Sequence, residues 1–446
     1  MTYKKKQPRF SPPVVQEDFP PGLEKNPDFM KVFDFLENTR EHVFVTGEAG
    51  TGKSTLLRYF RSRSAKNLAV VAPTGVAAIN VGGQTIHSFF RFPFHFMHRS
   101  DIKKLHKPEV MLNLDTLIID EASMIRADMM DAIDYSLRLN RGNMKTAFGG
   151  VQVVFFGDLF QLPPVMDEGM ELVYKDKYEN PYFFQAEVFD YIKPKYIALD
   201  KIYRQSNEDF IRLLQRVRNG ECGEGDMEIL NDRVKPLDFD RSEHIVTLTA
   251  VNADASRMNE RRLAALPGKE YRFNARIQGE FDPRLVIADE VLRLKKGAQI
   301  MMLRNDPEKR WVNGTIGRVA ELDENTIQVE IGGEVFEVAM SAWEKLKYSY
   351  DEVQDTIERE VIGLFQQFPL KLAWAITIHK SQGQTFDELH IDLGRGAFAH
   401  GQLYVALSRC RTLEGVTLKR PVLPSDFIFD ERIFGFRQRF ERLELN

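Results

Sequence analysis

The chain carries, at residues 47–54, the segment Gly47-Glu48-Ala49-Gly50-Thr51-Gly52-Lys53-Ser54. It matches Gly-x-x-x-x-Gly-Lys-Ser/Thr, and it lies between a strand-like apolar run and a helix-forming run. Glycines let the backbone curl so that successive N–H groups point at phosphate oxygens, and the helix N-terminus adds positive potential. A glycine turn that fits by chance is the alternative, but the strand–helix context disfavours it. We expect a nucleoside triphosphate here, with Lys53 at the terminal phosphates and Ser54 holding Mg²⁺.

The composition is that of an ordinary globular protein, with 446 residues, 43% hydrophobic and 28% charged. Its net charge of −4 means that any nucleic-acid binding must come from local basic patches. Cys222 and Cys410 lie far apart and outside any Cys-x-x-Cys pair, so no disulfide framework or zinc ribbon is indicated. No apolar run approaches the ~18 residues of a membrane span, and residues 1–21 lack an apolar signal core. We expect a cytoplasmic protein without a membrane partner.

Short apolar runs alternate with helical patterns through the first half of the chain, which predicts a parallel sheet covered on both faces. Ligands of such sheets gather at the carboxyl ends of the strands. The apolar run at 116–119 leads into Asp120 and Glu121, and the run at 151–156 leads to Gln161. Asp120 is placed to anchor Mg²⁺, and Glu121 to orient or deprotonate the attacking water. The uncharged amide of Gln161 can sense whether the γ-phosphate is present.

The segment 86–99 interleaves aromatic side chains with arginine and histidine, and Lys103 and Lys104 follow it. Bases stack on aromatic rings while cations follow the phosphates, so this composition suits single-stranded nucleic acid. A small hydrophobic cluster explains the aromatic residues equally well. Composition leaves both interpretations open.

The second half of the chain repeats the parallel pattern around an insertion. Closely spaced β runs with Asn-Gly and Gly-Gly turns between residues 291 and 340 predict a small antiparallel barrel. The parallel pattern resumes at residue 372, and a helix at 402–408 delivers Arg409. At the C-terminal end, apolar residues fall on one stripe of an expected packing helix: Ile433, Phe436, Phe440 and Leu443.

Two strand-rich units, of which only one has a P-loop, indicate a nucleotide held in a cleft between them. An arginine supplied from across such a cleft stabilises the charge that spreads over the γ-phosphate. Arg204 and Arg409 are the candidates. A surface or structural role is the alternative for both, and it has more weight for Arg204.

The order of the motifs along residues 26–418 resembles that of the PIF family (petite integration frequency) of DNA helicases, in superfamily one. These motifs are Gly47 to Ser54, Ala72-Pro73-Thr74-Gly75-Val76-Ala77-Ala78, Ile119-Asp120-Glu121-Ala122-Ser123-Met124, Gly157-Asp158-Leu159-Phe160-Gln161-Leu162-Pro163-Pro164, Tyr203-Arg204-Gln205, Thr377-Ile378-His379-Lys380-Ser381-Gln382-Gly383 and Tyr404-Val405-Ala406-Leu407-Ser408-Arg409. One departure is the stretch before the P-loop, Asp28-Phe29-Met30-Lys31, where relatives usually have a glutamine. Adenine selectivity is therefore left open.

The resemblance implies an α/β fold with two RecA-like parallel-sheet domains of the P-loop NTPase type. It adds a small wedge insertion to the first and a small antiparallel SH3-like barrel to the second. The expected boundaries are a flexible N-terminal tail at 1–25, domain one at 26–190 with the wedge at about 88–112, domain two at 191–285 and 362–420, the barrel at 286–361 and a C-terminal helical segment at 421–446. The aromatic residues between Phe92 and Met97 are the expected wedge.

Carried onto this chain, the resemblance makes Lys53, Asp120, Glu121, Gln161, Arg204 and Arg409 the catalytic residues and gives Mg²⁺ to Ser54 and Asp120. The residues expected at ATP are Gly47, Ala49, Gly50, Thr51, Gly52, Lys53, Ser54, Thr55, Gln161, Arg204, Gly383 and Arg409. Those expected along the DNA are Thr74, Gly75, His87, Ser88, Phe89, Pro163, His379, Lys380 and Ser381.

The activity that the resemblance implies is ATP-driven 5′-to-3′ movement on single-stranded DNA, with unwinding of forked or tailed duplexes, RNA–DNA hybrids or G-quadruplexes. We expect a monomer in the absence of DNA, acting in genome maintenance. Two other classes stay open: a DNA-independent P-loop ATPase that remodels a protein, and a non-enzymatic single-strand binding module. The first predicts hydrolysis that is indifferent to DNA, and the intact P-loop argues against the second.

Overall fold

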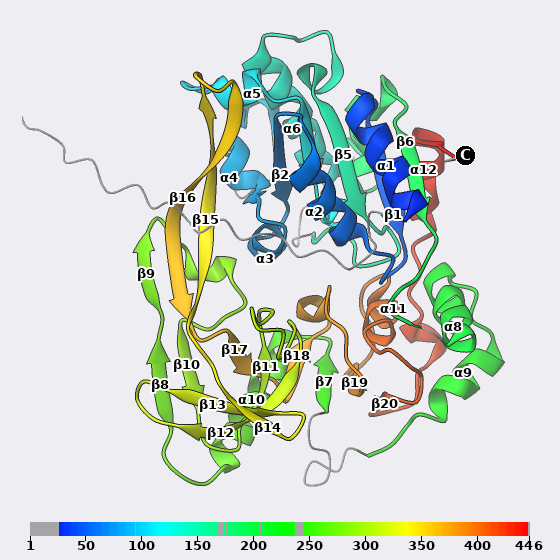
Figure 1. Cartoon of the computed structure of the whole chain (residues 1–446). Helices are drawn as coiled ribbons and strands as arrows, with labels where there is room; N and C mark the ends of the chain where they lie inside the picture. Colours follow the sequence, from blue (N-terminus) through cyan, green and yellow to red (C-terminus); the bar gives the residue numbers. More distant parts are fainter. Residues whose placement is uncertain are drawn as a thin grey trace, which may run out of the picture.

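A seven-stranded parallel sheet carries the P-loop in the computed structural model, which describes residues 26–93, 95–166, 174, 177–205, 207–236 and 245–444 (Figure 1). The tail predicted at 1–25 lies outside the described residues. The strand order is β21-β6-β1-β5-β4-β2-β3. The strands are β1 (Val43–Gly47), β2 (Leu68–Ala72), β3 (Gln84–Thr85), β4 (Thr116–Ile119), β5 (Gln152–Gly157), β6 (Lys195–Leu199) and β21 (Glu441–Arg442).

Helices cover both faces of this sheet, which is why its strands read as nearly continuous apolar runs. Val43 and Val45 face one hydrophobic cluster with α1 (Pro27–Asn38) and α2 (Lys53–Arg63), whereas Phe44 between them faces another with α6 (Ala127–Arg141). Three further helices among the described residues of this domain are short: α3 (Gly75–Asn80), α4 (Ile86–Phe90) and α5 (Glu109–Leu112). The alternation of side chains along β1 thus joins both layers at the strand that leads into the P-loop.

A second, four-stranded parallel sheet has the order β18-β7-β19-β20 and confirms the second predicted α/β unit. Its strands are β7 (Val246–Thr249), β18 (Ala375–Thr377), β19 (Leu389–Asp392) and β20 (Val416–Leu418). Its helices are α8 (Glu208–Asn219), α9 (Glu224–Asn231), α10 (Asn252–Ala265) and α11 (Gln402–Leu407). Among the helices in the described ranges, none is long and apolar enough to cross a membrane.

The insertion in the second unit is antiparallel, as predicted, but it is larger than 286–361. A five-stranded sheet of order β14-β13-β12-β11-β17 borrows β17 from beyond that range, and β10 pairs with β8 from before it. The strands are β8 (Tyr271–Asn274), β10 (Val291–Leu294), β11 (Gln299–Met302), β12 (Ile316–Leu322), β13 (Ile327–Ile331), β14 (Glu334–Glu337) and β17 (Leu370–Leu372). Edge strands need partners, so these flanking segments complete the sheets.

A long hairpin, which the sequence patterns did not predict, projects from this insertion towards the first domain (Figure 1). It consists of β15 (Ser341–Asp351) and β16 (Thr356–Gln367), and β16 also pairs with β9 (Arg276–Gly279). The Tyr348 hydroxyl accepts a 2.8 Å hydrogen bond from the Val70 N–H, and the Gln84 amide donates to the Leu346 carbonyl at 2.5 Å. The hairpin is thus bound to the P-loop domain by buried polar contacts.

The aromatic segment of the predicted wedge lies largely in the core of the first domain. Phe89, Phe90, Phe92 and Met97 are all buried, and the rings of Phe90 and Phe92 stack at 5.1 Å. The hydrophobic-cluster interpretation therefore describes these four side chains. Phe94 lies outside the described residues, and the wedge expected between Phe92 and Met97 stays a prediction. Apolar rings are more stable packed against the sheet than left in water.

The C-terminal segment is not the helix expected at 421–446. It forms short 3₁₀ turns, a single helical turn α12 (Phe436–Arg439) and strand β21, which pairs with β6 at the sheet edge. Ile433, Phe436 and Phe440 are buried against the first domain, as their spacing indicated. The free edge of β6 offers backbone hydrogen bonds that a helix could not use.

Candidate active site

The P-loop adopts the curled backbone that phosphate binding requires. Gly50 and Gly52 both have φ of 87°, and a Cβ on Gly50 would lie 2.5 Å from the Cβ of Arg204. Lys53 opens α2, and its Nζ donates to the carbonyls of Gly47 at 2.6 Å and Glu48 at 2.9 Å. Burial lowers the pKa of Lys53. The lysine therefore has only neutral acceptors from the loop itself, and an anionic ligand would improve its environment.

Asp120 and Glu121 follow β4 near Lys53, with Asp120 buried and Glu121 half-buried. Burial, followed by the neighbouring charge of Glu121, raises the pKa of Asp120 to about 7. Burial also raises the pKa of Glu121, against the attraction of Lys53 and Arg409. Glu121 has φ of 49°, a backbone conformation that non-glycine residues rarely adopt and that is often found at functional sites. Two desolvated carboxyl groups side by side suit a divalent cation.

Asp158, at the end of β5, forms a buried ion pair with Arg218 of α8, which belongs to the second unit. The Arg218 Nη2 lies 2.9 Å from the Asp158 Oδ1, and the guanidinium carbon lies 3.7 Å from the Phe160 ring centroid. Burial alone would raise the pKa of Asp158, but Arg218 and Lys53 hold that pKa below its ordinary value. Gln161 donates to the same carboxylate at 3.2 Å and accepts from Gln382 at 3.4 Å. Gln161 thus connects the two units.

Arg409 and Arg204 approach the P-loop from the second unit and the linker before it. Arg409 is 1% exposed, and its guanidinium donates to the Val405 carbonyl and the Ser408 hydroxyl. Burial and the nearby Arg204 lower the pKa of Arg409 to about 9, and burial lowers that of Arg204 to about 10. A negatively charged ligand would relieve both effects.

Hydrogen bonds from the P-loop backbone hold the second unit and the linker next to the P-loop. The Tyr203 N–H donates to the Gly50 carbonyl at 2.9 Å, and the Tyr404 hydroxyl of α11 accepts from the Ala49 N–H at 3.1 Å. Tyr404 is 2% exposed. The P-loop is therefore hydrogen-bonded to the second unit through its own backbone.

The residues present fit a nucleoside triphosphate with a divalent cation. The cationic side chains of Lys53, Arg204 and Arg409 lie close enough to influence one another at the P-loop, and Asp120 and Glu121 supply hard oxygen ligands. Within the described ranges, no group of three or more His, Cys, Asp and Glu side chains could hold a metal. A Mg²⁺ ion at Ser54 and Asp120 would therefore complete its coordination with phosphate oxygens and water, as this ion commonly does.

The residues predicted along the DNA come from both units and differ in exposure. Ser88 and Lys380 are exposed; Thr74, Gly75, His87, Pro163 and His379 are half-buried; Phe89 and Ser381 are buried. A Cβ on Gly75 would lie 2.7 Å from Leu285, so the insertion covers this position. The Phe89 ring lies 5.7 Å from the Tyr348 ring, and the Ser381 hydroxyl donates to the Ile378 carbonyl. Their DNA contacts stay predictions.

The sequence patterns missed four residues that the fold brings to the site or its interface. Asp158 and Tyr404 lie inside quoted motifs but were given no role there, and Arg218 and Lys371 had no signal at all. Burial, together with the nearby Lys380, lowers the pKa of Lys371 to about 8.

Comparison with known proteins places this geometry in a family. A family model described as PIF1-like helicase matches residues 26–228, and one described as DNA helicase Pif1, 2B domain, matches residues 285–322. The ATP-dependent DNA helicase Pif1 of Bdellovibrio bacteriovorus is 34% identical over 436 residues, covering 94% of this chain and 93% of that protein. This chain belongs to the PIF1-like helicases. The PIF1-like resemblance of its motifs and its α/β RecA-like fold are thereby confirmed.

Solved PIF1-like structures match most of the chain. Unliganded Pif1 from Bacteroides sp. superposes with a TM-score of 0.85 at 37% identity, covering 93% of this chain and 96% of that one. The same relative in complex with ADP-AlF4 also gives 0.85, whereas its complex with single-stranded DNA gives 0.67. The chain therefore superposes better on the unliganded relative and on its ADP-AlF4 complex than on its complex with single-stranded DNA. The human ATP-dependent DNA helicase PIF1 is 36% identical over 392 residues, but this chain spans only 58% of its length.

Proposed function

We propose that this chain is an ATP-dependent DNA helicase that moves 5′ to 3′ on single-stranded DNA. The observation that carries the proposal is the joint between the P-loop and the second RecA-like unit, through Ala49 with Tyr404 and Gly50 with Tyr203. A nucleotide bound at this joint touches both units. Its hydrolysis is therefore coupled to their separation.

Each charged group has a role in that hydrolysis. Lys53 and Arg204 neutralise phosphate oxygens, and Arg409 stabilises the charge that develops during transfer. Mg²⁺ bound at Ser54 and Asp120 would supply further neutralisation of the phosphates. The Glu121 carboxylate orients the attacking water and accepts its proton. Gln161 couples the presence or absence of the γ-phosphate to the second unit through its hydrogen bond with Gln382.

DNA crosses both units in this proposal. Thr74 and His87 on one unit and His379 and Lys380 on the other contact its backbone, which makes binding largely independent of sequence. Alternate gripping by the two units advances the strand. Forked and tailed duplexes are the main substrates, with RNA–DNA hybrids and G-quadruplexes as further ones. The protein acts in genome maintenance, in the cytoplasm and associated with the nucleoid. It is a monomer in the absence of DNA.

The test is steady-state ATP hydrolysis with and without a single-stranded oligonucleotide, with Lys53→Ala as the inactive reference. We expect the oligonucleotide to raise the rate many-fold in the wild type and not in Lys53→Ala. A duplex with a 5′ tail should then be unwound, and one with only a 3′ tail should not. Equal hydrolysis with and without DNA would refute the helicase and favour an ATPase that remodels a protein partner.

A further inference from the structure

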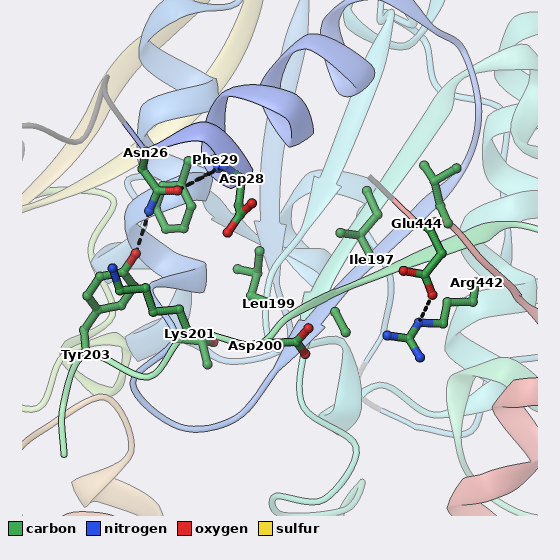
Figure 2. Close-up of a pocket in the computed structure, with 13 residues that line it drawn as sticks. Asn26, Asp28, Phe29, Ile197, Leu199, Asp200, Lys201, Tyr203, Arg442 and Glu444 are labelled. Carbon is green, nitrogen blue, oxygen red and sulfur yellow. Dashed lines mark hydrogen bonds and ion pairs between the residues drawn. The ribbon is translucent and has the colours of Figure 1, made fainter. Parts of the chain in front are cut away.

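A pocket of about 150 Å³ lies beside the P-loop, between the start of α1, the end of β6 and the C-terminal strand (Figure 2). Thr51 forms part of its wall, and a Cβ on the adjoining Gly52 would lie 2.8 Å from the Phe29 ring. At ~30 Å³ for each water, the volume corresponds to about five water molecules, which suits one small ring system. The pocket therefore continues the phosphate site to where the nucleoside of a bound nucleotide would extend.

Charge in this pocket suits a neutral ring and not another anion. The acidic residues Asp28, Asp200 and Glu444 face two basic residues, Lys201 and Arg442. Arg442 and Glu444 form an ion pair at 3.0 Å, so they neutralise each other. The other charged residues of the lining, Asp28, Asp200 and Lys201, are acidic on balance and would attract hydrogen-bond donors.

Most polar groups at the α1 end of the pocket are already engaged. The Asn26 side chain accepts from the N–H groups of Asp28 and Phe29 and donates to the Tyr203 hydroxyl at 2.5 Å. Lys201 lies over the Tyr203 ring, 5.2 Å from its centroid. Asn26 therefore cannot turn its amide to a base without uncapping α1.

The Asp28 carboxylate differs from these groups. It points away from the Phe29 ring into the space in front of Leu199 (Figure 2). In the part of the chain that the structure describes, no side chain pairs with it by a hydrogen bond or an ion pair. The two oxygens of an aspartate carboxylate only accept hydrogen bonds.

This chemistry favours one kind of base edge. Guanine presents two adjacent donors, N1–H and the 2-amino group, which a carboxylate accepts together. Adenine presents one amino group beside the N1 lone pair, which a second carboxylate oxygen repels. An amide side chain would pair with adenine instead, because it offers one donor and one acceptor.

We propose that Asp28 is the base-reading residue of this nucleotide site and that it makes GTP a substrate alongside ATP. The proposal rests on the nucleotide site proposed above at the P-loop. Asp28 holds the guanine edge by two hydrogen bonds, and the rings of Phe29 and Tyr203 bound the same pocket. Hydrolysis of GTP uses the same phosphate-binding residues as hydrolysis of ATP.

The experiment measures kcat/KM for DNA-stimulated hydrolysis of ATP, GTP and inosine triphosphate, which lacks the 2-amino group. The wild type should use GTP within about tenfold of ATP and inosine triphosphate less well than GTP. Asp28→Asn should lower the GTP-to-ATP ratio by roughly 10- to 100-fold, the range expected for hydrogen bonds to a charged group. It should also remove the difference between GTP and inosine triphosphate.

Asp34→Asn is the matched control, because Asp34 is exposed on the same helix but does not line the pocket. It should leave all three ratios unchanged. An unaltered GTP-to-ATP ratio in Asp28→Asn, even with a lower Tm, would overturn the proposal and leave Asp28 as a favourable charge at the helix N-terminus. Hydrolysis that survives Lys53→Ala would instead refute the P-loop site itself, so the two failures are distinguishable.

Discussion

Removal of Arg218 should separate the two RecA-like units, because Arg218 is the buried partner of Asp158 across their boundary. The Asp158 side chain is fully buried and the Arg218 side chain is 14% exposed. Arg218→Met keeps the apolar contact with Phe160 but removes the cation that forms the ion pair with the Asp158 carboxylate. Breaking a buried pair in this way costs about 3–5 kcal/mol.

The expected consequence is a large fall in thermal stability. For units of this size, each kcal/mol shifts Tm by about 2–4 °C, so Arg218→Met should melt about 6–20 °C below the wild type. Asp158→Asn with Arg218→Met should recover most of that loss, because neither buried charge then lacks a partner. Differential scanning calorimetry of the four proteins gives the double-mutant cycle.

Arg212→Met on the same helix is the control. Among the described residues Arg212 pairs with two exposed acidic residues, Glu208 and Asp209, so its loss should shift Tm by about 1 °C or less. Equal Tm values for Arg218→Met and Arg212→Met would refute a stabilising role of the Asp158–Arg218 ion pair. So would additive effects of the Asp158 and Arg218 substitutions in the cycle, because they would show that the two groups do not interact.

Three further predictions concern the joint, the metal ligand and the hairpin. Tyr404→Phe leaves the Ala49 N–H without its hydrogen bond, which costs about 1–3 kcal/mol. The contact between the two RecA-like units should therefore weaken in the absence of nucleotide, and an unchanged small-angle scattering profile would contradict this prediction. The pKa of Asp120 is raised to about 7, and Mg²⁺ binds the ionised carboxylate, so the Mg²⁺-dependent affinity for nucleotide should rise from pH 6 to pH 8. Isothermal titration calorimetry measures this affinity, and a flat pH profile would count against Asp120 as a Mg²⁺ ligand. Tyr348→Phe should speed hydrogen exchange at the Val70 amide, and unaltered protection would show that the hairpin does not depend on this bond.

The nucleotide chemistry could be predicted because its determinants are local. The P-loop needs only a few consecutive residues between a strand and a helix, and Asp120 with Glu121 follows directly from a strand end. Arg409 follows from its place at the end of α11. Such arrangements depend on spacings of a few residues, which the order of amino acids states directly.

The aromatic segment shows where composition is insufficient. Rings between Phe89 and Met97 could serve either as a base-stacking surface or as a core, and both need the same residue types. The packing of α4 and the following turn against the sheet placed Phe89, Phe90, Phe92 and Met97 in the core. The C-terminal stripe of apolar residues is similar: its burial was predictable, but its conformation depended on the free edge of β6.

The sequence alone therefore established the P-loop, the acidic pair, the two parallel-sheet units and the antiparallel insertion. The three-dimensional fold was needed for the contacts that connect them: Arg218 with Asp158, Tyr404 with Ala49 and Tyr348 with Val70. Each joins residues at least 60 positions apart in the chain. Their pairing depends on how whole units pack and on which polar groups become buried together. No short stretch of sequence specifies the packing of the units or the burial of these polar groups, because a buried donor pairs with an acceptor that only the folded chain brings within hydrogen-bonding distance.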